Sequence, residues 1–341
     1  MTFADIIQNN YSKQPISWWT RFAFHYTDVQ NAVGILSSGK LYSRSRANAC
    51  GAMKNDNASA QVIDMTNSDI YTYARFYFRP MTPTQYYNEG YKPLRLRYEN
   101  DINANVSVPI FFAFDLNKLL QNKRILFSNK GQAGSGSPLY GGEERFSQLE
   151  FDKIYSVGPA DNETIKYRHA ELLCQYEYNI DDSLEAILCR NEIERSTLLT
   201  LLLKTNRKAF YKYQQKIRVC KRDMFEKNGL FLQDMYLDDN DLKIVFADTY
   251  EKDKYMRKHL TAVELESLAP ISLLIDISWY NAQSSVYSTS LEVSVDYRNT
   301  KPIQICNLPI NKKASVMEVE LKLDGSLIGR VRFPLKDTEI V

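Results

Sequence analysis

The sequence is poor in the residues that build metal and redox sites. It contains only three histidines, His25, His169 and His259, and five cysteines at wide spacings. No two cysteines form a Cys-x-x-Cys pair, which excludes a zinc ribbon and a thioredoxin-like motif. Their odd number favours free thiols in a reducing cytosol over a disulfide framework. Since no HExxH motif is present either, we expect no bound metal.

Glycine-rich phosphate loops and long apolar runs are also missing. The chain has 13 glycines among 341 residues and no Walker loop, GxGxxG or GxSxG motif. A P-loop, a Rossmann site and a hydrolase nucleophile elbow are therefore unsupported. The longest apolar stretch, around residues 198–203, is far too short to span a membrane, and the polar N-terminus lacks the apolar core of a secretory signal. We expect a cytoplasmic protein that does not enter a membrane.

Net charge is nearly absent as well. The 43 lysines and arginines face 41 aspartates and glutamates, so the formal net charge is +2. This balance excludes a bulk basic field, and any contact with nucleic acid must come from local clustering. The chain is instead rich in rings, with 23 tyrosines and 16 phenylalanines, and such chains form ring-lined surfaces with polar tips. A length of 341 residues allows about two domains.

Local patterns predict a mixture of strands and helices in the first two thirds of the chain. Asp28 is placed to cap the start of a helix, and Gly39 is placed to end it in the left-handed conformation. Strands are expected at residues 22–27, 70–78, 108–114 and 164–178, and a long helix is expected at residues 191–215. The polar or glycine-rich residues 44–68 and 131–142 are expected to be loops.

The last third of the sequence changes character. From residue 271 to residue 334, strand-like runs alternate with turn signals, and Asp324-Gly325 predicts a hairpin turn between the last two strands. We therefore predict an all-β, sandwich-like module at residues 269–341. It follows a first domain at residues 1–205 and a basic helix with a connecting region at residues 206–268.

A basic stretch lies at residues 204–222, which hold eight lysines or arginines and no acidic residue. Phe210, Tyr211 and Tyr213 are interleaved with them. Four lysines are spaced four residues apart and would share one face while a helix lasts; they are Lys204, Lys208, Lys212 and Lys216. The stretch is either a solvated helix face with its rings in the core, or a surface for phosphates and stacked single-stranded bases.

Three further elements could carry chemistry. They are His25-Tyr26-Thr27 at a strand end, the aromatic strand from Tyr71 to Phe78, and Glu171 within the apolar text Arg168–Leu173. Taken singly, each has a structural explanation: a satisfied histidine, core packing and a carboxylate paired with an arginine.

The combination and its order resemble the DarT-type ADP-ribosyltransferases, toxins that modify nucleic-acid bases with the use of NAD. The resemblance covers residues 20–205 and rests on the segments FHYTDVQNAVGILSSGKLYSRSR, ARFYFRPMTPTQYYNEG, ILFSNKGQA and YRHAELL. It implies an α+β, ADP-ribosyltransferase-like fold with split antiparallel sheets before the β-rich module. NAD would be a substrate, and no metal would be needed.

The resemblance also implies roles for particular residues. Glu171 matches the catalytic glutamate, which would stabilise an oxocarbenium-like cation at the ribose and help to deprotonate the acceptor base. His25 matches the residue that binds the NAD ribose, helped by the backbone of Tyr26 and Thr27, and Tyr77 would lie against nicotinamide. Further NAD contacts are assigned to Asn31, Gly34 and Arg44.

The sequence departs from the family at the expected catalytic arginine. The helical segment that carries this residue in the family is not recognisable in residues 44–70. Arg44, Arg46 and Arg75 are the candidates, with Arg46 favoured and Arg75 next.

The acceptor and the partners complete the expectations. Asn129, Lys130 and Gln132 align with the loop that faces the acceptor, and the basic stretch would contribute Lys208, Lys212 and Lys216. Single-stranded DNA is the favoured acceptor, and RNA, such as messenger RNA, is the alternative. A degenerate fold that only binds is a third hypothesis. An enzyme of this type would belong to a toxin–antitoxin or phage-defence system and need an antitoxin protein.

Overall fold

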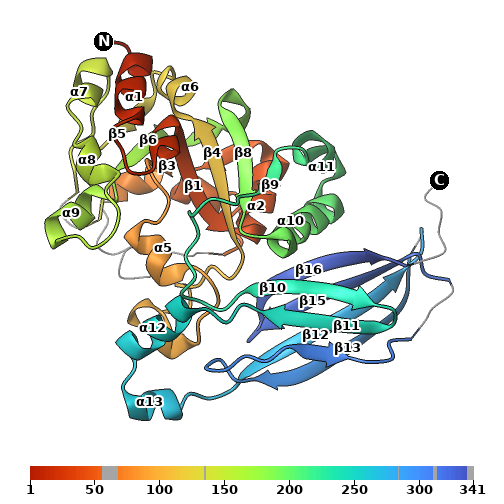
Figure 1. Ribbon diagram of the computed structural model, residues 1–341. Helices are drawn as coiled ribbons and strands as arrows, with labels where there is room; N and C mark the ends of the chain where they lie inside the picture. Colours follow the sequence, from red (N-terminus) through yellow and green to blue (C-terminus); the bar gives the residue numbers. More distant parts are fainter. Residues whose placement is uncertain (56–67, 134–135, 283, 310–312, 336–341) are drawn as a thin grey trace.

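A seven-stranded sheet forms the frame of the N-terminal part of the protein (Figure 1). The computed structural model describes residues 1–55, 68–133, 136–282, 284–309 and 313–335. The strand order is β5-β6-β3-β1-β4-β8-β9, and β8 and β9 form a parallel pair beside otherwise antiparallel neighbours. Its strands are β1 (Phe22–Asp28), β3 (Tyr73–Tyr77), β4 (Pro109–Asp115), β5 (Ile125–Phe127), β6 (Glu171–Gln175), β8 (Leu184–Cys189) and β9 (Ile217–Val219). A two-stranded sheet pairs β2 (Lys40–Tyr42) with β7 (Glu177–Asn179).

Helices cover this sheet and connect its strands (Figure 1). The α-helices are α1 (Phe3–Tyr11), α2 (Val29–Ser38), α3 (Arg44–Ala49), α5 (Pro83–Asn88), α6 (Leu116–Leu120), α7 (Glu143–Ser147), α8 (Phe151–Ile154), α9 (Asn162–Tyr167), α10 (Glu192–Thr205) and α11 (Arg207–Tyr213). The 3-10 helices are η1 (Ser17–Arg21), η2 (Ser68–Thr72), η3 (Leu94–Leu96), η4 (Tyr98–Asn100) and η5 (Ile180–Asp182).

The turn from β1 into α2 forms as the sequence predicts. The carboxylate of Asp28 accepts a hydrogen bond of 2.8 Å from the backbone N–H of Gln30, and so satisfies one of the free donors at the start of the helix. At the other end, Gly39 has a φ of 68°, the left-handed conformation that a glycine adopts without steric cost. Both predicted caps are confirmed.

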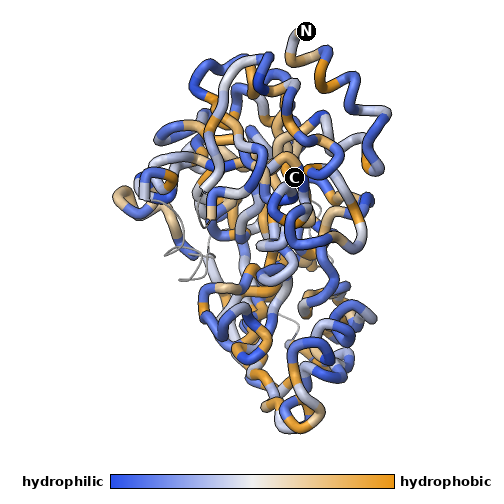
Figure 2. The backbone as a smooth tube through the Cα atoms, turned by 90° about the vertical axis from the view of Figure 1, so that its left-hand side faces the viewer, coloured by the Kyte–Doolittle hydropathy of each residue, from blue (hydrophilic) through white to orange (hydrophobic). Residues whose placement is uncertain are grey.

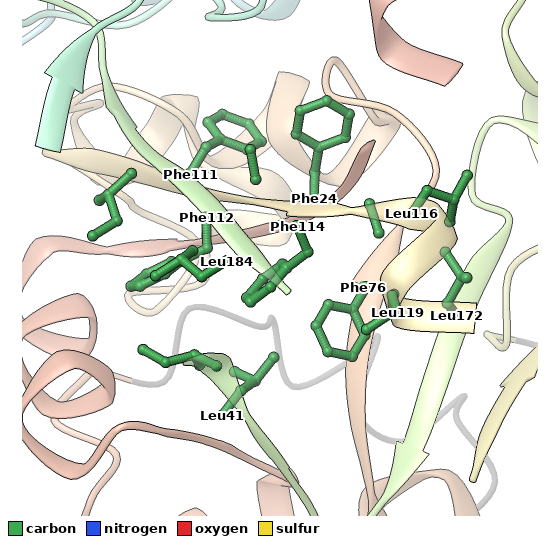
Figure 3. Packing of buried hydrophobic residues seen from close by; sticks show 14 of the residues in the cluster. Phe24, Leu41, Phe76, Phe111, Phe112, Phe114, Leu116, Leu119, Leu172 and Leu184 are labelled. Atoms are coloured by element: carbon green, nitrogen blue, oxygen red, sulfur yellow. The ribbon is translucent and has the colours of Figure 1, made fainter. Parts of the chain in front are cut away.

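At β4 the hydrophobic core lies on both faces of the sheet, and aromatic residues of this strand fill it. In Figure 3, the rings of Phe24 and Phe111 lie on one side of this strand, and those of Phe112 and Phe114 lie on the other. Six of its seven residues are buried. A strand covered on both faces needs apolar residues at every position, which explains the unbroken run of apolar residues in this segment.

The centre of the sheet is opened between β1 and β3. Strand β1 pairs with β4 along its whole length, from Phe22 to Asp28. Its register with β3, by contrast, consists of the single pair Phe24 and Tyr77. The backbone of β1 beyond Phe24 is therefore not laddered to β3, and this is where the sheet is split.

Four predicted elements differ from the structure. Residues 44–49 form α3 instead of a loop, because Ser43 accepts a capping hydrogen bond from the N–H of Arg46; the rest of that predicted loop, residues 56–67, lies outside the described residues. The strand predicted at 70–78 begins with η2, and the one predicted at 164–178 begins with α9, which Asp161 caps. The helix predicted at 191–215 is two helices, since Asn206 has extended backbone angles and caps α11.

Two further sheets form the C-terminal part (Figure 1), and Figure 2 shows the backbone turned by 90° and coloured by hydropathy. One contains β12 (Ile271–Tyr280), β13 (Ser285–Val295), β15 (Val316–Leu323) and β16 (Ser326–Pro334), and the other contains β10 (Leu232–Asp238), β11 (Asp241–Phe246) and β14 (Ile303–Ile305). Helices α12 (Tyr250–His259) and α13 (Ala262–Glu266) connect them. The predicted hairpin turn is confirmed, with positive φ angles of 43° at Asp324 and 79° at Gly325.

The two C-terminal sheets share one core. Leu242 and Ile244 of the smaller sheet belong to the same buried cluster as Ile275 and Trp279 of the larger one. This is the arrangement of a β-sandwich. The strands β10 and β11 lie within residues 206–268, the region predicted as a connection. The α+β fold class and the all-β C-terminal part are confirmed.

Two glycines let the N-terminal part approach the segment that leads into β10. Tyr91 and Leu230 exchange backbone hydrogen bonds of 2.8 and 2.9 Å. At this junction a Cβ on Gly229 would lie 2.6 Å from the carbonyl oxygen of Glu89 and 2.8 Å from the Cα of Gly90. Neither position leaves room for a side chain.

We therefore expect Gly229→Ala to lower the free energy of unfolding by about 1–3 kcal/mol, because the added methyl group overlaps backbone atoms that cannot move aside. The control is Gly141→Ala, whose Cβ would lie 3.5 Å from a Leu126 methyl group and should change stability by no more than about 0.5 kcal/mol. Urea denaturation measures both. Equal stability of the two variants would contradict the expectation.

Candidate active site

A cavity opens where β1 and β3 separate. It is bounded by β1, α2, α3 and η2, and Arg75 of β3 contributes to its wall. Six residues predicted to act in the site line it together: His25, Thr27, Asn31, Gly34, Arg44 and Arg75. The structure thus brings into one place residues from three separate segments of the sequence.

A buried ion pair lies beside this cavity. Arg75 of β3 donates from Nε to Glu171 Oε2 at 2.6 Å and from its terminal nitrogen to Oε1 at 2.5 Å. The Glu171 side chain is only 2% exposed. Although burial disfavours a charge, the adjacent carboxylate raises the pKa of Arg75. A two-point contact of this kind fixes the orientation of both planar groups.

His25 is joined to the same strand. Its Nδ1 lies 3.0 Å from the carbonyl oxygen of Arg75. Because a carbonyl only accepts, Nδ1 carries the hydrogen in the neutral ring, and Nε2 is left as an acceptor. Burial lowers the pKa of His25 to about 4. The ring is therefore neutral at physiological pH and can accept a hydrogen bond from a hydroxyl group.

The loop that precedes α7 is built around the carboxylate. Ser128 donates from its N–H to the carbonyl of Glu171 at 2.9 Å, and the N–H of Gln132 points at Glu171 Oε1 at 3.5 Å. The side chains predicted to read the acceptor make contacts within the chain. Asn129 accepts from the N–H of Glu150, Lys130 pairs with Glu163, and buried Gln132 donates to the carbonyl of Ser137.

The three candidate arginines have different surroundings. Arg75 contacts Glu171, and Arg44 lines the cavity with its guanidinium 5.8 Å from the centre of the Tyr71 ring. Arg46, the favoured candidate, instead pairs with Glu177 at 2.9 Å on the half-exposed side of α3. The geometry therefore favours Arg75 and Arg44 over Arg46, because Arg75 and Arg44 line the cavity and Arg75 also bonds Glu171, its diagonal neighbour across β3 and β6.

Helix α3 was not predicted from the sequence. Its signals are present: Ser43 as an N-cap, a run of residues without proline or β-branching, and Gly51 with a φ of 64° after its end. The expectation of a loop over residues 44–68 was wrong for residues 44–49.

Two of the predicted NAD contacts lie outside the cavity wall. The side chain of Tyr26 packs on Phe111 with ring centres 5.1 Å apart, so only the backbone of Tyr26 can border the cavity. Tyr77 lies beside Glu171 in the strand register and is not among the residues that line the cavity. The rings that do line it are Tyr42, Tyr71 and Tyr73. Tyr42 was not singled out from the sequence. Tyr71 and Tyr73 belong to the aromatic segment that was singled out, but only Tyr77 of that segment was given a contact with NAD.

The basic stretch does not form one free face. Its helix is broken at Asn206, and Lys204 pairs with Glu318 at 2.6 Å. Lys212 pairs with Asp181 at 2.5 Å, and Lys216 donates to the carbonyl of Leu184 at 2.7 Å. Lys208 remains exposed. The prediction of four lysines sharing a helix face was wrong, because the helix breaks at Asn206 and separate contacts engage Lys204, Lys212 and Lys216.

The described residues hold no cluster of three or more histidine, cysteine, aspartate or glutamate side chains suited to a metal ion. In the same part of the chain, no helix is both long and apolar enough to cross a membrane.

The chain is similar to a known family and to several solved structures. The family model described as "ssDNA thymidine ADP-ribosyltransferase, DarT" matches residues 24–225. Thermus sp. 2.9 DarT in complex with ADP-ribosylated ssDNA is 18% identical, with a TM-score of 0.46, and the match covers 60% of this chain and 96% of that one. The same enzyme in complex with NAD+ is 16% identical, with a TM-score of 0.44 over 60% and 98% of the two chains.

A third structure, Thermosipho africanus DarTG in complex with ADP-ribose, is 14% identical, with a TM-score of 0.42, and the match covers 55% of this chain and 48% of that one. No curated protein matches the chain.

The buried histidine predicts a pH dependence of stability. The pKa of His25 is about 4 in the folded protein, and its ordinary value is 6.5. Between these pH values, His25 therefore binds a proton in the unfolded chain but stays neutral in the folded one. Relative to His25→Gln, the wild type should lose about 1.4 kcal/mol of unfolding free energy per pH unit between about pH 6.5 and 4. Urea denaturation across this range tests it. Parallel pH profiles for the two proteins would show that His25 titrates normally.

Proposed function

The chain belongs to the DarT family of ADP-ribosyltransferases, and on this premise we propose that it transfers ADP-ribose from NAD+ to a base of single-stranded DNA, with thymine as the acceptor. The observation that carries the proposal is the Arg75–Glu171 pair beside a cavity lined by His25. Family membership and this intact pair argue against a degenerate module that only binds.

The reaction breaks the bond between nicotinamide and ribose C1′. As nicotinamide leaves with the electrons of that bond, positive charge develops on the sugar. The Glu171 carboxylate, held in place by Arg75, is suited to face this cation and a ribose hydroxyl group. A charge that is already oriented before the reaction needs no reorganisation in the transition state.

Different residues of the cavity would contact different parts of NAD+. Neutral His25 offers Nε2 as an acceptor for a ribose hydroxyl group. Arg44 supplies the positive charge that a pyrophosphate requires. The rings of Tyr71 and Tyr73 provide flat apolar surface for a planar part of the ligand.

The acceptor must lose a proton. Thymine has one ring N–H, so substitution at a ring nitrogen breaks that bond. The proton passes to the Glu171 carboxylate, whose oxygens keep lone pairs beyond those bound by Arg75. The electron pair left on the nitrogen then forms the new bond to C1′.

We also propose that the enzyme acts as a toxin in the cytoplasm, where NAD+ and single-stranded DNA are both present. Modified thymine would damage the cell's own DNA, so an antitoxin protein is required to restrain or reverse the reaction. An enzyme that damages DNA and a protein that restrains it are the two components of a toxin–antitoxin or phage-defence system. Survival of cells that express the wild type as well as cells that express Glu171→Gln would contradict a toxin role.

We expect Glu171→Gln to lower the rate of transfer by about 100-fold or more, because an amide cannot balance the developing positive charge. The control is Glu185→Gln, which alters a surface carboxylate paired with Lys118 and should leave the rate unchanged. Mass spectrometry of single-stranded oligonucleotides after incubation with NAD+ measures both. A rate of transfer by Glu171→Gln equal to that of the wild type would disprove the proposed mechanism.

The same assay separates DNA from RNA. Matched deoxy- and ribo-oligonucleotides of one sequence, containing thymine and uracil respectively, should differ by about 100-fold or more in favour of DNA. A preference for the ribo-oligonucleotide would make RNA the acceptor, with the same chemistry at the ribose.

A further inference from the structure

His169 lies beside the Arg75–Glu171 pair, and the mechanism above gives it no role. It occupies the turn between α9 and β6, two residues before Glu171. A Cβ on Gly131 would lie 2.7 Å from the Cβ of His169. The loop that covers Glu171 through the N–H of Gln132 therefore also passes directly over this histidine.

Of the three histidine rings, only that of His169 has no hydrogen-bond partner among the described residues. The ring of His25 is bonded to the carbonyl of Arg75, and that of His259 is 2.8 Å from the carbonyl of Tyr255. All three histidines lie in the described part of the chain. His169 is partly exposed, so a ligand can reach it.

Other polar groups of this loop are not available in the same way. The side chains of Asn129, Lys130 and Gln132 are engaged within the chain, and the hydroxyl of Ser128 donates to the carbonyl of Lys130 at 2.7 Å. Both oxygens of Glu171 accept from Arg75. Among the side chains of this loop and of the turn before Glu171, the imidazole of His169 is thus free to form a new hydrogen bond beside the carboxylate.

The charge state of His169 suits this role. Burial lowers its pKa to about 4, with Glu171 opposing and Arg75 reinforcing the shift. The ring is neutral at physiological pH, and a neutral imidazole carries one N–H donor and one acceptor. It can therefore bond to a base without adding a charge that competes for the Glu171 carboxylate.

We propose that His169 recognises the acceptor base by donating a hydrogen bond to the carbonyl next to the reacting ring N–H. The inference rests on the proposed function and names the determinant of its acceptor. Thymine has a carbonyl on each side of its ring N–H, and guanine has one beside its own. Cytosine and adenine in their usual forms have no ring N–H within a strand, so this geometry rejects them. As the base loses its proton to Glu171, the same hydrogen bond holds the negative charge that spreads onto the carbonyl oxygen.

The test compares His169→Phe, which removes the donor but keeps a planar ring, with His169→Gln, which restores an N–H donor. His259→Phe is the matched control, because His259 stacks on Tyr255 in α12 outside the site. For each protein, transfer to a thymine-containing single-stranded oligonucleotide is measured together with the Kd of NAD+. We expect kcat/KM for the oligonucleotide to fall about 10- to 100-fold in His169→Phe and less in His169→Gln. The Kd of NAD+ should stay within about twofold in all of them.

Each outcome decides one question. If the wild type modifies the oligonucleotide and His169→Phe does so equally well, the inference about His169 is wrong and the proposed function stands. If the affinity for NAD+ falls by the same factor as transfer, His169 serves the NAD+ site or the fold and not the acceptor. If the wild type modifies no oligonucleotide of either kind, the proposed function fails and the inference fails with it.

Discussion

The ion pair between Arg75 and Glu171 is the interaction around which the candidate site is built. A carboxylate that is 2% exposed is costly to bury without a partner, and a two-point arginine contact meets that need. The antiparallel register of β3 with β6 pairs Arg75 with Leu173 and Tyr77 with Glu171, so Arg75 and Glu171 are diagonal neighbours on one face of the sheet. The same two residues hold their surroundings: Ser128 exchanges hydrogen bonds with the backbone of Glu171, the N–H of Gln132 points at its carboxylate, and His25 bonds to the carbonyl of Arg75.

Structural features that depend only on residues close together in the chain could be predicted from the sequence. Asp28 and Gly39 act within one helix, and Asp324-Gly325 acts within one hairpin, so each depends on local backbone geometry alone. Glu171 and His25 were singled out because their segments are distinctive and occur in the order of a known family. The β-rich end of the chain was visible for a similar reason, since alternation of apolar and polar residues is itself local.

Features set by distant contacts could not be predicted in this way. Spacing alone placed four lysines on one helix face, yet Asp181 and Glu318, far away in the sequence, decide where two of them point. The choice between Arg46 and Arg75 depends in the same way on which carboxylate the fold brings near. The cavity itself arises from the separation of β1 and β3, which no short segment encodes.

We propose that NAD+ occupies the cavity between β1 and β3 with its nicotinamide ribose at Glu171. A crystal structure with an NAD+ analogue whose glycosidic bond resists cleavage tests this most directly. We expect a ribose hydroxyl group within about 3 Å of the Glu171 carboxylate, with His25 Nε2 in contact with the ligand. An analogue bound elsewhere, or bound in the cavity with this ribose away from Glu171, would show that Glu171 does not face the reacting sugar.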